Sequence, residues 1–295
     1  MSIIETLQGA YDLHVHTAPD VMERKLDDMD MAERCKKIGM KGFGIKSHYF
    51  CTAERAKLVK RIHPEVDAIG MICLNHSVGG LNPMALEMAA RDGAKIVSMP
   101  TVDTLNERNN FEQKTPKKPA YWAQLYLKLK EQGKVLPAIS ILDGSKIRRE
   151  VEELLDIVAE YNLILVTGHI GKEETYELVK AARNHNVKKV MVTHPNTLTT
   201  YYTKEEQKEL ADIGAYMEHC FNVAYINKIS WEELIEQIRY VGCERCVLST
   251  DLGQPTGPYP DEGLLMFVTK LFENGFTKDQ IKRMTIENTN FLVKD

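Results

Sequence analysis

Short apolar runs alternate along the chain with longer amphipathic stretches. The apolar runs, rich in Val and Ile, are residues 11–15, 42–45, 68–74, 95–99, 136–142, 163–166, 189–192, 215–217 and 246–249. The clearest stretches of helical periodicity are residues 53–62, 147–161, 173–184, 204–213, 231–241 and 261–274. Repeated strand–helix units of this kind predict a parallel sheet with covered faces, either open and doubly wound or closed into a barrel.

The spacing of the polar residues that end these runs decides between the two architectures. They are His16, His48, His76, Pro100, His169, His194, His219 and Asp251. Most neighbours are about 24 to 32 residues apart, close to the ~31-residue repeat of a (β/α)8 barrel. The interval from Pro100 to His169 is more than twice as long. We therefore predict one α/β domain, residues 1–295, folded as a (β/α)8 TIM barrel, with 136–142 as an extra strand-like segment outside the wall, between the fourth and fifth barrel strands.

Composition narrows the class of protein further. Of 295 residues, 43% are hydrophobic and 27% are charged, and the net charge is −4. This acidic balance argues against nucleic acid as a partner, because nucleic-acid-binding domains carry basic patches. Residues 68–86 form the longest charge-free stretch, but polar residues and Pro83 interrupt it, so no membrane span is expected. The chain starts without the features of a signal peptide and its six cysteines are scattered, so we predict a cytoplasmic protein and leave open whether it is a homo-oligomer.

The strongest local motif lies at the end of the first apolar run. Asp12, His14 and His16 alternate there, so their side chains share one face of a strand. Two imidazoles that project together from the carboxyl end of a barrel strand form half of a divalent-metal site. The alternative is a pair of histidines whose nitrogens are satisfied by hydrogen bonds.

Later strand ends supply more residues of the metal-ligating type. His169 and His194 follow two later runs, and Asp251 follows the last one. Zn²⁺ accepts histidine nitrogen and carboxylate oxygen together. Chance explains one such placement easily and five poorly. We therefore predict one or two divalent ions, with zinc as the expected metal, held by His14, His16 and Asp251 with His169 or His194.

These motifs resemble the amidohydrolase superfamily of metal-dependent hydrolases, and the match is closest to an amidohydrolase-related, phosphotriesterase-like group without an assigned substrate. The resemblance runs from DLHVHT through GHIG and VTHPN to STDLGQP and the ending ENTNFL. It implies that His14, His16 and Asp251 hold one metal and that His169 and His194 can hold a second. It also implies that Asp251 assists proton transfer.

One departure from the family pattern concerns the group that bridges two metals. Two-metal members often place a carboxylated Lys or a Glu at the end of the fourth strand, whereas residues 98–101 read SMPT here. Instead, Lys46 and His48 end the second run. Lys46 is a candidate catalytic residue that bridges metals or anchors substrate, and a salt bridge at the barrel rim is the alternative. His48 is a candidate substrate-binding residue.

Other side chains are candidates for contacting the substrate. His76 follows the third run and could instead satisfy the adjacent loop. Glu218 and His219 alternate on one strand, so only one of them faces inward, and parity does not say which.

Two loops that follow barrel strands are locally basic. They contain Arg24, Lys25, Arg108, Lys114, Lys117 and Lys118. Arg24 and Arg108 could each hold a carboxylate or phosphate with two hydrogen bonds. This basicity hints at a small anionic substrate, such as a carboxylated lactone, a cyclic amide or a phosphate ester, and ordinary solvated loop charge is the alternative.

The favoured function is hydrolysis of a small-molecule amide, lactone or ester by metal-activated water, with Asp251 moving the proton. A phosphoesterase of the PHP or TatD type is one alternative, since both share an HxH opening. Their later motifs fit less well, because PHP proteins usually have Thr-Asp-His where this chain has Lys46, Ser47 and His48. A barrel that binds metal without turnover is the other alternative, because fold and function are separable.

Overall fold

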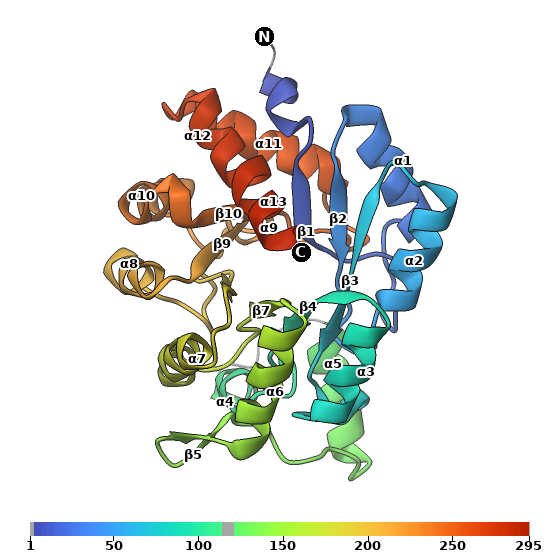
Figure 1. Ribbon diagram of the computed structural model, residues 1–295, viewed down its shortest axis with the longest axis vertical. Coiled ribbons are helices and arrows are strands. Elements are labelled where there is room, and N and C mark those ends of the chain that lie inside the picture. Colours follow the sequence, from blue (N-terminus) through green and yellow to red (C-terminus); the bar gives the residue numbers. More distant parts are fainter. Residues whose placement is uncertain (1–2, 114–120, 295) are drawn as a thin grey trace.

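The computed structural model describes residues 3–113 and 121–294. Eight parallel strands form one sheet in the order β1-β2-β3-β4-β7-β8-β9-β10. They are β1 (Tyr11–Val15), β2 (Gly42–Ile45), β3 (Asp67–Cys73), β4 (Ala94–Ser98), β7 (Ile164–Val166), β8 (Lys189–Thr193), β9 (Tyr216–Cys220) and β10 (Cys246–Ser249). Because alternating helices surround this sheet, the predicted (β/α)8 barrel is confirmed (Figure 1).

The barrel closes where its first and last strands meet. Val15 and Leu252 form a parallel bridge there. The amide of His16 donates to the carbonyl of Leu252 over 2.8 Å, and that of Asp251 donates to the carbonyl of His14 over 2.9 Å. Lower on the same seam, Asp12 accepts hydrogen bonds from the amide and the hydroxyl of Thr250 at 3.0 and 2.5 Å. The seam therefore joins the two chain segments from which three of the predicted ligands come.

The outer layer consists of helices that lie between the strands in sequence. The longer ones are α1 (Asp28–Ile38), α2 (Ala53–Ile62), α3 (Pro83–Arg91), α4 (Leu105–Gln113), α5 (Tyr121–Glu131), α6 (Arg149–Glu160), α7 (Lys172–Asn184), α8 (Lys204–Ile213), α10 (Trp231–Val241) and α11 (Pro260–Glu273). Shorter turns are η1 (Ile3–Leu7), η2 (His76–Val78), α9 (Phe221–Tyr225), η3 (Cys243–Arg245), α12 (Lys278–Lys282), the π-helical η4 (Arg283–Glu287) and α13 (Asn288–Val293).

Local chemistry explains why these helices begin and end where they do. The side chain of Thr203 accepts from the amide of Glu206 to cap α8, and Gly214 ends that helix with a left-handed φ of 111°.

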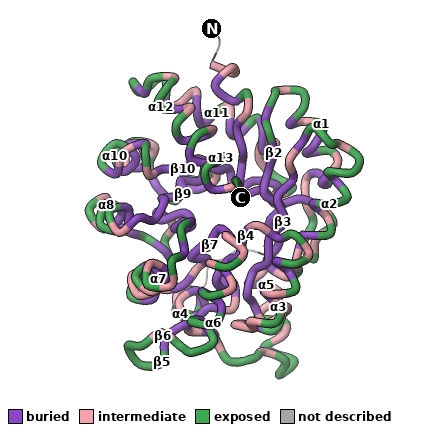
Figure 2. Tube along the Cα trace, viewed as in Figure 1, coloured by how far each residue is buried: buried purple, intermediate pink, exposed green. Residues whose placement is uncertain are grey.

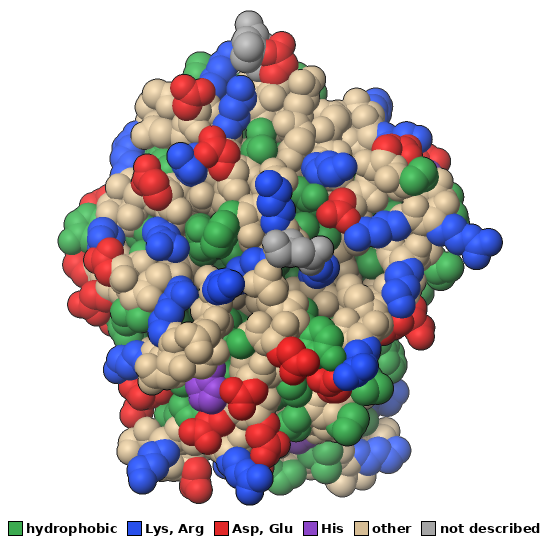
Figure 3. Space-filling model, in the orientation of Figure 1, with side chains coloured by type: hydrophobic (Ala, Val, Ile, Leu, Met, Phe, Trp, Pro, Cys, Tyr) green, Lys and Arg blue, Asp and Glu red, His purple; other side chains and the backbone are tan. Residues whose placement is uncertain are grey.

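No described helix combines the length and the apolar character that a membrane span requires. On the face shown in Figure 3, acidic and basic side chains are interspersed.

The apolar core has two layers, one between sheet and helices and one inside the barrel. Tyr11, Ile96 and Val247 belong to the inner cluster, which also includes Leu292 of α13. Leu292 is 1% exposed, and α13 crosses the middle of the barrel in Figure 1. Nearly all residues of the barrel strands are buried, and the strands are mostly purple in Figure 2, because both of their faces are covered. The inner cluster fills the amino-terminal end of the barrel, so the carboxyl end is left for the site.

The segment 136–142 lies outside the barrel wall, as predicted, but little of it is a strand. Ile139 forms one isolated bridge with Thr104, and only β5 (Leu142–Asp143) pairs, with β6 (Lys146–Ile147). Because β4 and β7 already pair with each other, the barrel sheet has no open edge for this segment. Its amides are satisfied singly, as when Ile139 donates to the carbonyl of Asp103.

Candidate metal centre

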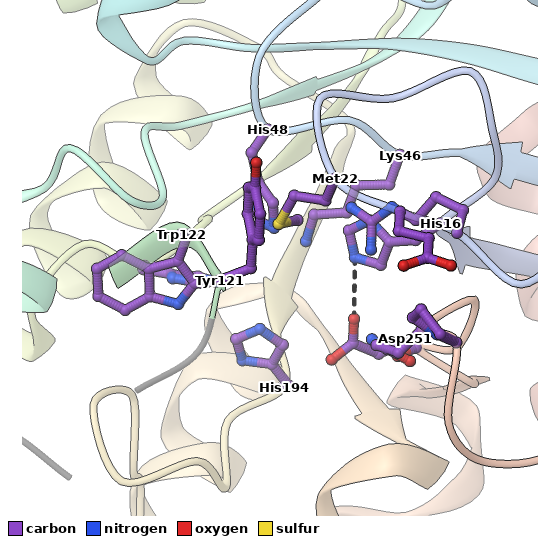
Figure 4. A pocket seen from close by; sticks show the side chains of 13 residues that line it. His16, Met22, Lys46, His48, Tyr121, Trp122, His194 and Asp251 are labelled. Carbon is purple, nitrogen blue, oxygen red and sulfur yellow. Dashed lines mark hydrogen bonds and ion pairs between the residues drawn. The ribbon is translucent and has the colours of Figure 1, made fainter. Parts of the chain in front are cut away.

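A cavity of about 480 Å³ opens at the carboxyl end of the barrel. Figure 4 shows His16, Lys46 and His48 on one side of it and Asp251 and His194 on the other. These side chains follow β1, β2, β8 and β10, so the parallel sheet delivers all of them to one edge. His169 and Arg24 also line the cavity.

Three predicted ligands converge on one point. The Nε2 atoms of His14 and His16 each lie 3.1 Å from the same oxygen, Oδ1 of Asp251. One ligand atom from each residue lies within 4.8 Å of the others, as a shared cation requires. His14 is 2% exposed and His16 is 3% exposed, so both imidazoles are almost fully buried. The donor set of two imidazoles and one carboxylate fits Zn²⁺ and related cations.

The charges around this point favour a cation. Burial and Lys46 both lower the pKa of His14, but Glu218 and Asp251 outweigh them and raise it to about 9. Burial and the charge of Arg24 lower the pKa of His16 to about 3. Burial alone would raise the pKa of Asp251, but His14 and His16 bring it well below its usual range. In the metal-free protein the proton on His14 therefore supplies the positive charge that a bound metal would otherwise supply.

The backbone around the centre is held in uncommon conformations. Asp251 has a φ of 54° and His194 a φ of 25°, both positive values in residues with side chains. Gly253 has a φ of 123°, and a Cβ added there would lie 1.7 Å from the carbonyl oxygen of His16. Strain of this kind persists only where the surroundings fix it, and it is concentrated at functional sites.

The structure answers the question of which residue on β9 faces the centre. Glu218 points inward, with Oε2 3.2 Å from Nδ1 of His14, and it is 1% exposed. Its other oxygen, Oε1, is buried with no hydrogen-bond partner in the described part of the chain. His219 points the other way, and its Nδ1 lies 3.2 Å from the amide nitrogen of Asn196. Burial lowers the pKa of His219 to about 3, as expected of a neutral core histidine.

Lys46 reaches the same centre from β2. Its Nζ lies 2.7 Å from Nε2 of His14, and its side chain is buried. It is therefore placed within the barrel rather than in a salt bridge at the rim.

The remaining histidines of the cavity form a ring of neighbours with the first two. The centroid distances are 5.5 Å for His14–His16, 5.2 Å for His16–His48, 6.1 Å for His48–His169, 4.9 Å for His169–His194 and 5.9 Å for His194–His14. Four different strand ends supply these five imidazoles besides Asp251 on a fifth. The set predicted from the sequence is thus brought together in space.

Some predicted site residues lie elsewhere or are already paired. His76 holds the carbonyl of Pro137 through Nε2 at 2.7 Å and does not line this cavity. Arg108 pairs with Asp103 and donates to the carbonyl of Leu136, so it, like His76, contacts the segment 136–142.

The basic loop residues contribute less to the cavity than the sequence suggested. Arg24 lines it, but Nε and Nη2 donate to Oδ2 of Asp20 at 2.8 and 2.6 Å. Lys25 lies over the ring of Tyr259, 4.8 Å from its centroid. Lys114, Lys117 and Lys118 lie outside the described residues.

Several residues of the site were not predicted from the sequence. Glu107 of α4 places Oε2 3.3 Å from Nδ1 of His169. Tyr121 and Trp122 of α5 close one side of the cavity. No local signal marks these residues, because each reaches the centre from a helix rather than from a strand end.

A second lobe of about 390 Å³ adjoins the first and shares Trp122, His169, His194 and Asp251 with it. Its other walls mix apolar side chains, among them Phe111, Leu198 and Val223, with polar ones such as Asn110 and Asn222. The histidines and Asp251 therefore stand between two lobes of mixed lining.

Comparisons with known proteins place the chain in a family. A model described as "Family of unknown function (DUF6282)" matches residues 9–218, and the chain belongs to this family. A comparison with curated proteins returns no match.

Solved structures with the same fold include hydrolases of the kind that the motifs resemble. An amidohydrolase from Pseudomonas aeruginosa matches with a TM-score of 0.66 and 11% identity, over 100% of this chain and 99% of that one. The probable dipeptidase PvdM from Pseudomonas aeruginosa matches with a TM-score of 0.66 and 9% identity, over 98% and 95%. A mutant organophosphorus hydrolase from Deinococcus radiodurans matches with a TM-score of 0.59 and 12% identity, over 98% and 94%. At these identities the likeness establishes a shared barrel fold.

Proposed function

We propose that this protein is a metal-dependent hydrolase that acts on an amide, lactone or ester bond of a small molecule. The observation that carries the proposal is the convergence of His14 and His16 on one oxygen of Asp251, buried at the carboxyl end of the barrel. The fold shared with an amidohydrolase and a probable dipeptidase supports it. Zinc is the metal we expect, because the donors are imidazole nitrogens and a carboxylate oxygen.

His14, His16 and Asp251 would hold the cation. When bound, such a cation polarises the scissile carbonyl and lowers the pKa of a coordinated water to about 7. The nitrogen of His14 that faces away from Asp251 is fixed by Glu218, so the ring presents Nε2 to the centre. The unpartnered Nδ1 of His16 is buried, so the ring gains no other contact that would turn it away.

Asp251 is the group that we assign to proton transfer. Its side chain is 19% exposed, which makes it the member of the ligand set that also reaches both lobes of the cavity. Its lowered pKa keeps the carboxylate ionised and able to accept a proton from the attacking water. The same carboxyl group then donates that proton to the leaving nitrogen or oxygen.

Lys46 is the second residue that we place in the chemistry. An ammonium 2.7 Å from His14 Nε2 would be repelled by a cation bound there. In a loaded centre Lys46 would therefore turn into the cavity and anchor the substrate, or its neutral amine would add to CO2, with loss of a proton, and offer carbamate oxygens as ligands. Both roles require that the Lys46 side chain reach the centre, whereas a salt bridge at the barrel rim would hold it away from the centre.

The two lobes suggest how a substrate lies. Each lobe has apolar walls for an acyl or aryl group and polar side chains for the remainder of the molecule, and the scissile bond would lie between them, at Asp251. An anionic substituent would be met by Arg24 alone among the predicted arginines. Because two of its donor atoms already hold Asp20, it has less to offer than a free guanidinium.

Metal analysis and a substrate panel test the proposal. Protein purified without chelator should contain one or two equivalents of a divalent transition metal by elemental analysis. It should hydrolyse at least one member of a panel of lactones, amides and carboxylic esters, and Asp251→Asn should abolish that activity. Turnover of phosphate esters alone would favour the phosphoesterase alternative. Metal-bound protein inert on the whole panel would favour a binding role, and fully active metal-free protein would overturn the proposal.

A further inference from the structure

One face of helix α5 lines a third cavity, of about 290 Å³. Trp122, Leu125, Tyr126 and Leu129 contribute this lining, and their spacing of three and four residues places them on one side of the helix. All four are only partly buried. The apolar face of α5 therefore borders an open space, which we call the α5 cavity, where a core helix would pack against protein.

The rest of the lining carries more positive than negative charge. Arg108 and Lys134 both line the α5 cavity, and Asp103 is the one acidic residue among the described residues of its walls. Asp103 is already engaged, since it pairs with Arg108 and accepts the amide of His76 at 2.9 Å. No ion pair joins Lys134 to another residue of the described part of the chain. The cavity is therefore suited to an anion.

Arg108 retains a donor that the protein does not use. Its side chain is 8% exposed, Nη1 donates to the carbonyl of Leu136 at 2.6 Å, and Nη2 is paired with Asp103. Nε is buried and has no hydrogen-bond partner among the described residues. A buried N–H without an acceptor costs free energy, which an oxygen bound beside the guanidinium would recover. Cζ lies 5.2 Å from the centroid of the Tyr126 ring, so positive charge and aromatic surface adjoin here.

We propose that the α5 cavity is a second ligand site, independent of the metal centre, for a small molecule that joins an apolar or aromatic body to one carboxylate. The body would lie against Leu125, Leu129 and the aromatic rings, and the carboxylate would lie at Arg108 and Lys134. Apolar and aromatic walls with a few placed polar groups are typical of small-molecule sites. The volume is at the lower end of the range for such sites, roughly 300–1,000 Å³, so the ligand is small.

Trp122 joins the α5 cavity to the catalytic one. It lines the α5 cavity and both lobes at the metal centre. His14, His16 and Asp251 do not line the α5 cavity. A ligand bound there would therefore fix one wall of the catalytic cavity without contacting the residues that would hold the metal.

The fluorescence of Trp122 tests the proposal in the full-length protein. The chain has only one other tryptophan, Trp231, which packs against Phe221 and Phe267. In Trp231→Phe, titration with phenylacetate should change the remaining fluorescence saturably, with a Kd of about 1 mM or tighter for a molecule of about ten non-hydrogen atoms. Phenylethanol, which lacks the charge, should bind at least about 10-fold more weakly, because it forms no charged hydrogen bond.

Two variants and two matched controls locate the bound probe. Leu129→Phe fills part of the cavity and should weaken both probes by at least about 10-fold. Lys134→Met should weaken phenylacetate about 2–5-fold and leave phenylethanol unchanged. Leu127→Phe and Lys128→Met make the same changes at exposed positions near or on α5 that do not line the cavity, and they should leave both Kd values unchanged.

The opposite results are equally specific. Fluorescence that does not saturate, or an unchanged Kd in Leu129→Phe, would overturn the site, and equal Kd values for the two probes would overturn its preference for an anion. A carboxylate is also a metal ligand, so the titration is repeated on metal-stripped protein; binding that disappears there belongs to the metal centre and counts against the α5 cavity. The proposed hydrolase function stands in each of these cases. If Trp231→Phe does not fold, as judged by circular dichroism, calorimetric titration of wild type gives the same Kd values.

Discussion

Metal binding at this centre should release a proton from His14 and should therefore become tighter as the pH rises. In the metal-free protein the carboxylates of Glu218 and Asp251 raise the pKa of His14 to about 9. A metal ligand must be the neutral imidazole, so the cation and the proton compete for the same nitrogen. His16, with its pKa lowered to about 3, and the ionised Asp251 have no proton to lose near neutrality.

The size of the effect follows from the pKa of His14. At pH 7 only about 1 in 100 of these side chains is neutral, which weakens the apparent affinity by about 100-fold, or ~2.7 kcal/mol at 1.36 kcal/mol per pKa unit. At pH 9 about half are neutral, so the affinity should rise about 50-fold between pH 7 and pH 9. About one proton should be released per cation bound at the first site at pH 7.

Two measurements check this prediction. Calorimetric titration of metal-stripped protein in buffers of different ionisation enthalpy counts the protons released, and chelator competition gives the affinity at each pH. Glu218→Gln is the control, because it removes one of the two charges that raise the pKa of His14 and should reduce proton release at pH 7. A proton count near zero in wild type at pH 7, with an affinity that does not change up to pH 9, would refute the reasoning.

The same shift has an opposite consequence for the metal-free fold. The folded-state pKa of His14 lies above its unfolded value of about 6.5. Its contribution to the free energy of unfolding is therefore fully present below about pH 6.5 and is lost as the pH rises through 9. Urea unfolding of metal-stripped protein should show this decline, whereas metal-loaded protein should not.

Three further changes have expected outcomes. Lys46→Met should keep the fold by circular dichroism, because it removes a buried ammonium, and should abolish turnover or lower metal content; unchanged kinetics would return Lys46 to a passive role. Leu292→Ala should lower the free energy of unfolding by about 2–5 kcal/mol in urea, since the side chain packs inside the barrel, and a loss below 1 kcal/mol would contradict that packing. Gly253→Ala should lose metal content, because its Cβ would displace the carbonyl of His16, and full metal content would show that this loop adjusts freely.

Periodicity predicted the barrel because its strands are buried on both faces and therefore stand out as apolar runs. The runs at 11–15, 42–45 and 246–249 coincide with β1, β2 and β10. The segment 136–142 shows where this signal fails. Its apolar residues pack outside the wall, and an apolar run has the same appearance whether it joins a sheet or covers one.

The alternation of side chains along strands predicted those site residues that lie on or just after a strand. His14 on β1 and His16 just after it turn toward the same centre, and Lys46 follows β2 within reach of His14. Parity did not decide between Glu218 and His219, because the residue that contacts Nδ1 of His219 is Asn196, which lies beyond the preceding strand.

The sequence pattern did not predict the residues that reach the site from helices. Glu107 meets His169 across a long stretch of chain, and no period or motif links them. Arg108, which follows Glu107 in sequence, was predicted to contact the substrate, but its side chain pairs with Asp103. The direction of a side chain on a short helix depends on packing, which single-sequence patterns do not contain.

The seam between β1 and β10 makes barrel closure and site formation one event. His14 and His16 lie on one side of it and Asp251 on the other, at opposite ends of the chain. Contacts between residues so far apart in sequence form late in folding. The chain must first lose the conformational entropy of closing a long loop, and only then do the contacts stabilise it. A cation that binds only when the seam is closed stabilises the folded barrel. At a free cation concentration 100 times its Kd, it adds about 2.7 kcal/mol to the free energy of unfolding. The metal supply of the cell would then govern how long this chain stays closed as well as whether it can react.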